Sequence, residues 1–152
     1  MTPSDQSYAV PKLDSGTVID HLRGRTALRC LQVLDLPEDA QVTVGINLRS
    51  ERLGFKDIIK IGNHELTGDD AAKLALISPD ATMSIIRDYK VHRKLDLVPP
   101  LRFRGLIRCT NPACITRAEN VLGSFFVQSN DPVVARCEYC ERAIEAAEFV
   151  WR

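Results

Sequence analysis

Four of the chain's five cysteines lie near its C-terminal end, in the pattern Cys109-x4-Cys114 followed by Cys137-x2-Cys140. Each close pair can wrap one side of a metal ion, and Zn²⁺ favours four thiolates arranged as a tetrahedron. When sulfur fills all four positions, no site remains for a reactive water. The spacing therefore predicts one structural zinc ion per chain, in a small domain that needs such a staple to fold.

Two alternatives stay open for these cysteines. They could form two disulfides or remain free thiols, and Cys137-x2-Cys140 alone could be a thioredoxin-like redox pair. The N-terminal segment lacks the basic and apolar regions of a secretory signal, so we expect a cytoplasmic protein in which thiols stay reduced. The redox motif also lacks its βαβ setting. No run approaches the roughly 18 apolar residues of a membrane span, so no membrane partner is expected.

Two consecutive prolines at positions 99 and 100 divide the chain. They cannot continue a helix or donate to a strand ladder, and they favour an extended linker. The whole cysteine pattern follows them. We therefore expect a first domain over residues 1–95, a linker over 96–100 and a zinc-binding domain over 101–152.

The first domain alternates strand and helix patterns. Apolar alternation and β-branched residues predict strands at 15–21, 42–48, 56–61 and 83–91. Helices are expected at 27–34, with Cys30 on the apolar face as a small core residue, and at 71–77 after the N-cap Thr67. This βαββαβ order is typical of a ferredoxin-like split βαβ sandwich, whose second sheet face is free for a ligand or partner.

The second domain reads as a small antiparallel β unit of the zinc-ribbon kind. Strands are expected at 103–108, in a hairpin formed by 124–128 and 133–136, and at 143–151. Together the two domains predict an α+β protein.

Some polar residues of the first domain fit a purely structural account poorly, namely Asp20, His21, Lys60, Arg93 and Lys94. Lysine and histidine can bind phosphate oxygens, and an aspartate can accept from ribose hydroxyls. Each also has a plain alternative as a solvent-facing strand, loop or linker residue. The chain has no glycine-rich phosphate loop and no nucleophile–base set, so the pattern indicates binding and not catalysis.

The whole chain resembles the regulatory chain of bacterial aspartate carbamoyltransferase, from about residue 8 to its end. The stretches that carry the resemblance are Gly16–His21, Lys56–Ile61, Asp88–Val91 and the cysteine pattern with Cys137-Glu-Tyr-Cys140. The resemblance implies a non-catalytic allosteric subunit of pyrimidine biosynthesis. It would bind CTP as inhibitor and ATP as activator, form a homodimer through its N-terminal domain and dock on the catalytic chain through its zinc domain.

The resemblance also implies a nucleotide site in the first domain. Asp20 matches a ribose contact, His21 and Lys94 match phosphate contacts, and Lys60 matches a lysine near ribose and base. The base would lie against the N-terminal segment and the last strand, at Val10, Leu13, Ile86, Tyr89 and Val91. Ser84 stands in the pocket where the family commonly has asparagine, and Pro11 and Lys12 alter the N-terminal segment.

In the zinc domain the resemblance implies contacts from Asn111 and Glu141 to the catalytic chain. Ala113 and Arg117 replace a common asparagine and a common histidine there.

A rival interpretation is a zinc-ribbon adaptor that binds nucleic acid or another protein. Its candidate contacts are Arg102, Arg104, Arg108, Arg117 and Phe125. Twenty basic residues balance twenty acidic ones, however, and four glutamates surround the second cysteine pair. A neutral chain with an acidic knuckle does not attract a polyanion, so we expect no nucleic-acid partner.

Overall fold

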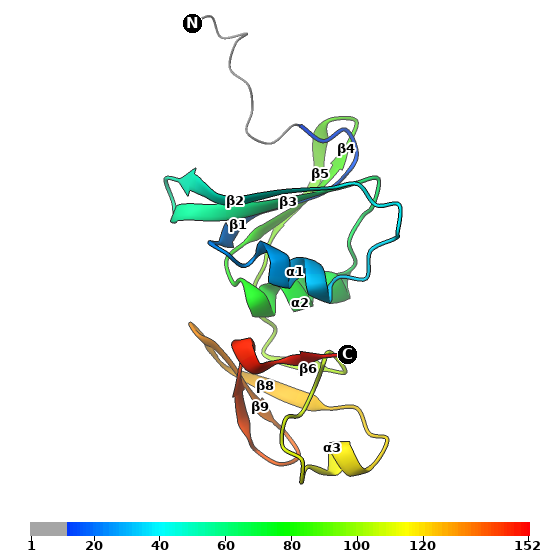
Figure 1. Ribbon diagram of the computed structural model, residues 1–152, viewed down its shortest axis with the longest axis vertical. Coiled ribbons are helices and arrows are strands. Elements are labelled where there is room, and N and C mark those ends of the chain that lie inside the picture. The colour runs from blue at the N-terminus through cyan, green and yellow to red at the C-terminus, as the bar shows by residue number, and fades with distance from the viewer. Residues whose placement is uncertain (1–11) are drawn as a thin grey trace, which may run out of the picture.

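The computed structural model describes residues 12–152, so Val10 and Pro11 lie outside the described residues. The chain forms two units stacked end to end (Figure 1). The N-terminal unit is a sheet covered on one side by two helices, and the C-terminal unit consists of small antiparallel sheets. The α+β class is confirmed. No helix among the described residues is long and apolar enough to cross a membrane.

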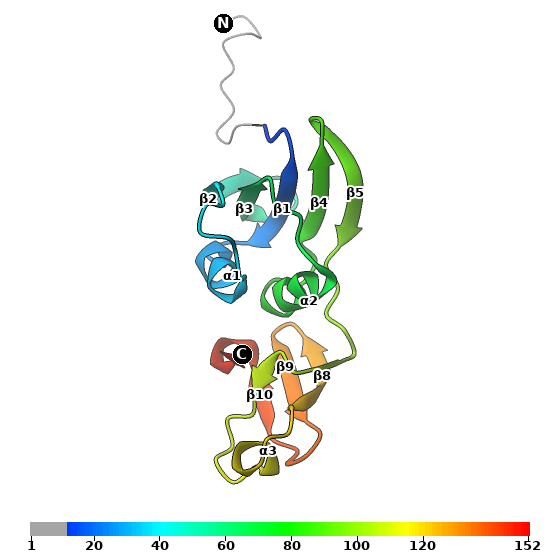
Figure 2. The same cartoon turned by 90° about the vertical axis from the view of Figure 1, so that its right-hand side faces the viewer.

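The N-terminal unit has a five-stranded antiparallel sheet in the order β2-β3-β1-β4-β5. Its elements are β1 Gly16–Arg23, α1 Ala27–Val33, β2 Val42–Ser50, β3 Gly54–Gly62, α2 Gly68–Ile77, β4 Thr82–Arg87 and β5 Lys90–Asp96. The first four strands have the arrangement of a split βαβ sandwich. Both helices lie against the same sheet face, which leaves the other face uncovered (Figure 2).

The core of this unit lies between the helices and the sheet. Ile19, Ile59 and Leu74 are fully buried there. Cys30 is buried beside them, and its burial raises the pKa of its thiol to about 12. It is therefore the small, unreactive core residue that the helical pattern predicts. At the start of α2, the predicted N-cap Thr67 accepts the backbone N–H of Asp70 in a reciprocal capping box.

The prediction of one last strand over 83–91 was wrong, because this segment forms the hairpin of β4 and β5. The turn residues Asp88 and Tyr89 have φ angles of +51° and +62°. Two left-handed residues in succession match the twist of a two-residue hairpin. Tyrosine rarely adopts this conformation, so the sequence around Tyr89 did not predict a turn. Lys94 consequently lies within edge strand β5 and not after the sheet.

A buried carboxylate holds the helix-side face together. Asp57 on β3 is fully buried and accepts the N–H of Ala27, at the start of α1, at 3.0 Å. Its second oxygen accepts the N–H of Asn47 at 2.9 Å, where β2 shifts register. This shift turns Ile46 outward to 45% exposure and breaks the alternation that the sequence shows in 42–48.

The C-terminal unit has sheets ordered β10-β9-β8-β6 and β11-β7. Its elements are β6 Arg102–Arg104, β7 Ile107–Arg108, α3 Ile115–Ala118, β8 Ser124–Asn130, β9 Val133–Cys137, β10 Ala143–Glu145, the 3₁₀ turn η2 Ala146–Glu148 and β11 Val150–Trp151. The predicted hairpin is present. The single strands predicted at 103–108 and 143–151 are each divided in two, the first at Gly105 with φ +75° and the second by η2.

The first unit extends to Leu97, which is buried in its core and exchanges backbone hydrogen bonds with Asp80 and Ala81. The last strand of the sheet, β5, ends at Asp96. The segment that follows, with its two prolines, connects the units.

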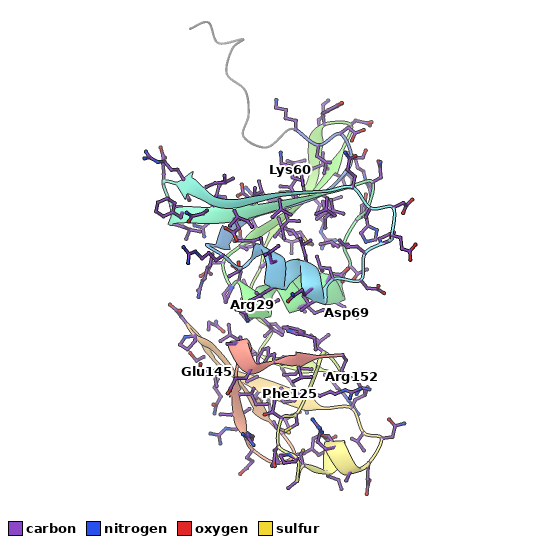
Figure 3. All side chains as sticks on the ribbon, in the orientation of Figure 1. Arg29, Lys60, Asp69, Phe125, Glu145 and Arg152 are labelled. Carbon is purple, nitrogen blue, oxygen red and sulfur yellow. The ribbon has the colours of Figure 1, made fainter. Side chains whose placement is uncertain are left out.

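The two units make direct contact through α1 and α2. Leu76 of α2 is fully buried in the core of the C-terminal unit, and Trp151 packs against both cores. The Arg29 guanidinium of α1, labelled in Figure 3, donates to the carbonyl of Ala146 at 3.3 Å. At the end of β1, Arg23 forms an ion pair with Asp131 at 3.1 Å.

Candidate metal centre and sheet-face site

The four clustered cysteines converge in the C-terminal unit. All four sulfurs lie within 4.8 Å of one another, with Cys109 and Cys140 at 3.5 Å and Cys114 and Cys137 at 3.8 Å. Zinc–sulfur bonds of about 2.3 Å in a tetrahedron place sulfurs about 3.8 Å apart. The observed separations fit this geometry and are too long for the roughly 2 Å of a disulfide. These four residues hold a structural Zn²⁺ ion.

Backbone and side-chain donors point at the sulfurs. The N–H of Asn111 lies 3.5 Å from Cys109 Sγ. Burial raises the pKa of the Cys109 thiol to about 12. At Cys140 burial acts in the same direction, but hydrogen bonds from the Asn111 side chain and the Arg142 backbone outweigh it and lower the pKa to about 7. Such donors stabilise thiolate and orient it toward a cation.

The two loops that carry the cysteine pairs place Asn111 and Glu141 near the metal. The side-chain oxygen of Asn111 accepts the N–H of Ala113 at 3.0 Å, so it is used within its own loop. Glu141 has a φ of +65°, donates its N–H to the carbonyl of Cys137 and leaves its carboxylate exposed. Of the two, Glu141 is the more available to a partner.

Strand register places three of the predicted nucleotide-site residues in one row. Residues opposite each other in an antiparallel pair share a sheet face. Val18 on β1 lies opposite Lys60 on β3 and opposite Ser84 on β4. Ser84 in turn lies opposite Lys94 on β5. Lys60, Ser84 and Lys94 therefore form a row across the sheet.

This row lies on the face without helices. Ile19, Ile59 and Met83, the neighbours of the row along the three central strands, are buried in the core beneath the helices. Side chains alternate along a strand, so the row points the other way. Figure 3 shows Lys60 on that side, away from α1 and α2.

A β-bulge brings His21 to the same face. The register of β1 against β3 shifts between Ile19 and Leu22, and His21 has a φ of +56°. Its Nδ1 lies 3.1 Å from the hydroxyl oxygen of Thr82, which stands opposite Asp20. Bulges re-aim side chains in this way, and here the bulge sets His21 beside Asp20.

Asp20 is held as a carboxylate by close donors. It accepts the N–H of His21 at 2.6 Å and pairs with Lys56 Nζ at 2.8 Å. Partial burial alone would raise the pKa of Asp20, but the hydrogen bonds from Lys56 and the His21 backbone outweigh it and hold the pKa below its usual range. Partial burial lowers the pKa of Lys60, against the opposing effect of Asp20.

The predicted base-contacting residues gather at the hairpin end of this face. Ile86 on β4 is buried and lies opposite Val91 on β5, which is 59% exposed. Tyr89 lies in the turn at 71% exposure and not along a strand, which corrects the expectation. Its N–H donates to the carbonyl of Asp14, next to half-buried Leu13.

Two residues that contact the predicted nucleotide-site residues were not predicted from the sequence. Lys56 pairs with Asp20, and Thr82 lies within hydrogen-bonding distance of His21. Lys56 could have been predicted from the alternation of β3, because Lys56 and Lys60 are four residues apart and therefore share a strand face. Nothing in the sequence pattern marks Thr82, since its role depends on which strand lies beside β1.

Two of the residues proposed as nucleic-acid contacts make other interactions within the protein. Phe125 is fully buried in the second core and stacks on Phe103 at 5.4 Å between ring centroids. Arg102 pairs with Glu138 at 2.9 Å and lies over the Phe126 ring. The alternative therefore loses its aromatic contact and one of its arginines.

Comparison with known proteins gives matches over both units. The family model described as aspartate carbamoyltransferase regulatory chain, allosteric domain, matches residues 8–98, and that of the metal binding domain matches residues 102–150. A regulatory chain from Methanothermobacter thermautotrophicus is 46% identical over 142 residues, covering 92% of this chain and 91% of the relative. One from Methanocaldococcus jannaschii is 44% identical over 149 residues, covering 98% and 99%.

Proposed function

The chain belongs to the family of aspartate carbamoyltransferase regulatory chains, and we propose that it binds CTP as inhibitor and ATP as activator on its helix-free sheet face. It is a non-catalytic subunit whose partner is the catalytic chain of that enzyme. Its zinc ion stabilises the fold. We further propose that it forms a homodimer, that Asn111 and Glu141 contact the catalytic chain, and that it acts in the cytoplasm.

The observation that carries the effector proposal is the convergence of charge on one open face. Lys60 and Lys94 lie in one row, and His21 and ionised Asp20 lie beside it. Cationic donors recognise phosphate oxygens, and a carboxylate accepts from ribose hydroxyls. The apolar hairpin end, with Ile86 and Val91, offers the base a surface to pack on. Val10 would extend that surface from outside the described residues.

Regulation requires that nucleotide binding differ between two states of the assembled enzyme. Coupling of this kind is typically about 1–3 kcal/mol. Strand β1 connects the relevant parts, because it carries Asp20 and His21 at its bulge and ends at Arg23, which pairs with Asp131 of the zinc unit. A shift of β1 on binding the phosphates would therefore act on the second unit directly.

We place the homodimer contact at the β2 edge of the sheet. An open edge pairs readily with another strand unless charge blocks it. Edge strand β5 carries Lys90, Arg93 and Lys94, which repel a second copy. Edge strand β2 instead exposes Ile46, with Val44 half-buried beside it. Two copies would extend the sheet across β2.

The effector site is tested in the holoenzyme reconstituted from zinc-loaded chain and catalytic trimers. Lys60→Ala and Lys94→Ala should each weaken CTP binding about tenfold, as expected for loss of a charge-assisted hydrogen bond to phosphate. The matched control is Arg93→Ala, because Arg93 is the next residue on β5 and lies opposite core-facing Ile85. Unchanged CTP affinity and response in both lysine variants would refute the assignment.

A further inference from the structure

A pocket of about 160 Å³ lies beside the metal centre, between β7, α3 and Arg152, the residue that follows β11. We call it the arginine pocket, after Arg108, Arg117 and Arg152, which all line it. Figure 3 shows Arg152 at the end of β11, on the side of the unit where α3 lies. The effector site and the metal site use none of these three side chains.

The side chains that line this pocket carry net positive charge, with three arginines against one glutamate. Within residues 12–152, no carboxylate lies within ion-pair distance of Arg108, Arg117 or Arg152. Glu119 is the one acidic residue in the lining, and it reaches none of them. Arg117 is held in place, because it donates to the carbonyl oxygen of Cys109 at 3.1 Å. Guanidinium groups around a concave surface, one of them held in place, fit a planar oxyanion in a forked geometry.

The position of the pocket indicates where that oxyanion comes from. Cys109 lines it, so it adjoins the loop of the first cysteine pair, which carries Asn111. On the second loop, Glu138 and Glu141 are acidic, and Glu138 is already paired with Arg102. The arginines of the pocket therefore lie beside the first loop, whereas exposed Glu141 on the second loop is followed by exposed Arg142. A protein surface with an acidic group facing the first loop would complement this arrangement.

We propose that the arginine pocket binds an aspartate or glutamate side chain of the catalytic chain. The carboxylate accepts from Arg108 and Arg117 and fixes the first cysteine loop on the partner. This inference rests on the proposed function, because it names a contact within the regulatory–catalytic assembly. It also gives a role to Arg117, which stands where the family commonly has histidine.

The test is assembly of the zinc-loaded chain with catalytic trimers, with dissociation constants measured at low and high salt. Arg108→Ala should weaken assembly about tenfold and flatten its salt dependence, as expected for one charge-assisted contact. Arg104→Ala is the matched control, since Arg104 is an exposed arginine of the same unit outside the pocket. Arg117→Ala should give a similar loss with an unchanged zinc content.

A double-mutant cycle then identifies the partner group. One acidic residue of the catalytic chain, changed to alanine, should weaken assembly no further in the Arg108→Ala background. The inference is overturned if Arg108→Ala and Arg117→Ala assemble as Arg104→Ala does. It is also overturned if inorganic phosphate binds wild-type but not Arg108→Ala chain while assembly is unaffected, because the pocket then takes a free anion. Failure of the wild-type chain to assemble would instead count against the proposed function.

Discussion

Chelation of zinc should unfold the C-terminal unit while the N-terminal sheet stays folded. The reason lies in how the metal site is built into the core. Cys109, Cys114 and Cys137 are buried in the same cluster as Phe125 and Ile144. The ligands are thus core residues, and releasing them opens the interior of the unit.

The expected magnitude is larger than the unit's own stability. About 50 residues at roughly 0.05–0.15 kcal/mol each give about 3–8 kcal/mol of folding free energy. Structural zinc contributes about 10–16 kcal/mol to small domains at pH 7. Burial raises the pKa of the Cys109 thiol to about 12, so without the ion this sulfur would be protonated and would lose its strongest interaction. The metal-free unit should therefore be unfolded at pH 7.

The assay uses Trp151, the only tryptophan of the chain. It packs edge-on against Phe149 at 5.6 Å between ring centroids and contacts both cores. Chelation should shift its fluorescence toward that of exposed tryptophan and remove the near-ultraviolet circular dichroism of the unit. Cys140→Ala should lower the zinc content below one ion per chain, whereas the control Cys30→Ala should leave it at one. Unchanged fluorescence and dichroism after complete zinc removal would refute this reasoning.

Three further outcomes are expected in the full zinc-loaded chain. Asp57→Ala should lower the free energy of unfolding in urea by about 3 kcal/mol, because two backbone donors lose their acceptor. Asp57→Asn should lower it by about half as much. A loss below about 0.5 kcal/mol for both variants would contradict the role given to this carboxylate. The pKa of Asp20 is depressed when folded, so its ion pair stabilises the chain above about pH 4 and is lost as pH falls through the folded pKa. Lys56→Met should therefore flatten the acid decline of stability, and an identical decline would count against the pair. A double-mutant cycle on Arg23 and Asp131 should give a coupling free energy of at most about 1 kcal/mol, since this pair is exposed. Removal of either partner should reduce the CTP response of the holoenzyme without changing its affinity for CTP.

The sequence by itself determined the metal site and the class of the fold. Cysteine spacing is a local property, and two close pairs of cysteines are typical of a zinc site. The spacing predicted Cys109, Cys114, Cys137 and Cys140 as the ligands, and the sulfur separations then excluded disulfides. Hydrophobic periodicity is also local. It located both helices and three strands of the first unit, and Thr67 marked where α2 begins.

Tertiary structure decided what depends on neighbours far away in the chain. The bulge at Asp20 and His21, and the partners Lys56 and Thr82, follow from which strands lie beside β1. The hairpin at Asp88 and Tyr89 arises because strand pairing stabilises a turn that tyrosine alone disfavours. Local patterns record the period of an element, but the convergence of side chains on one sheet face depends on long-range register, and only the fold sets that.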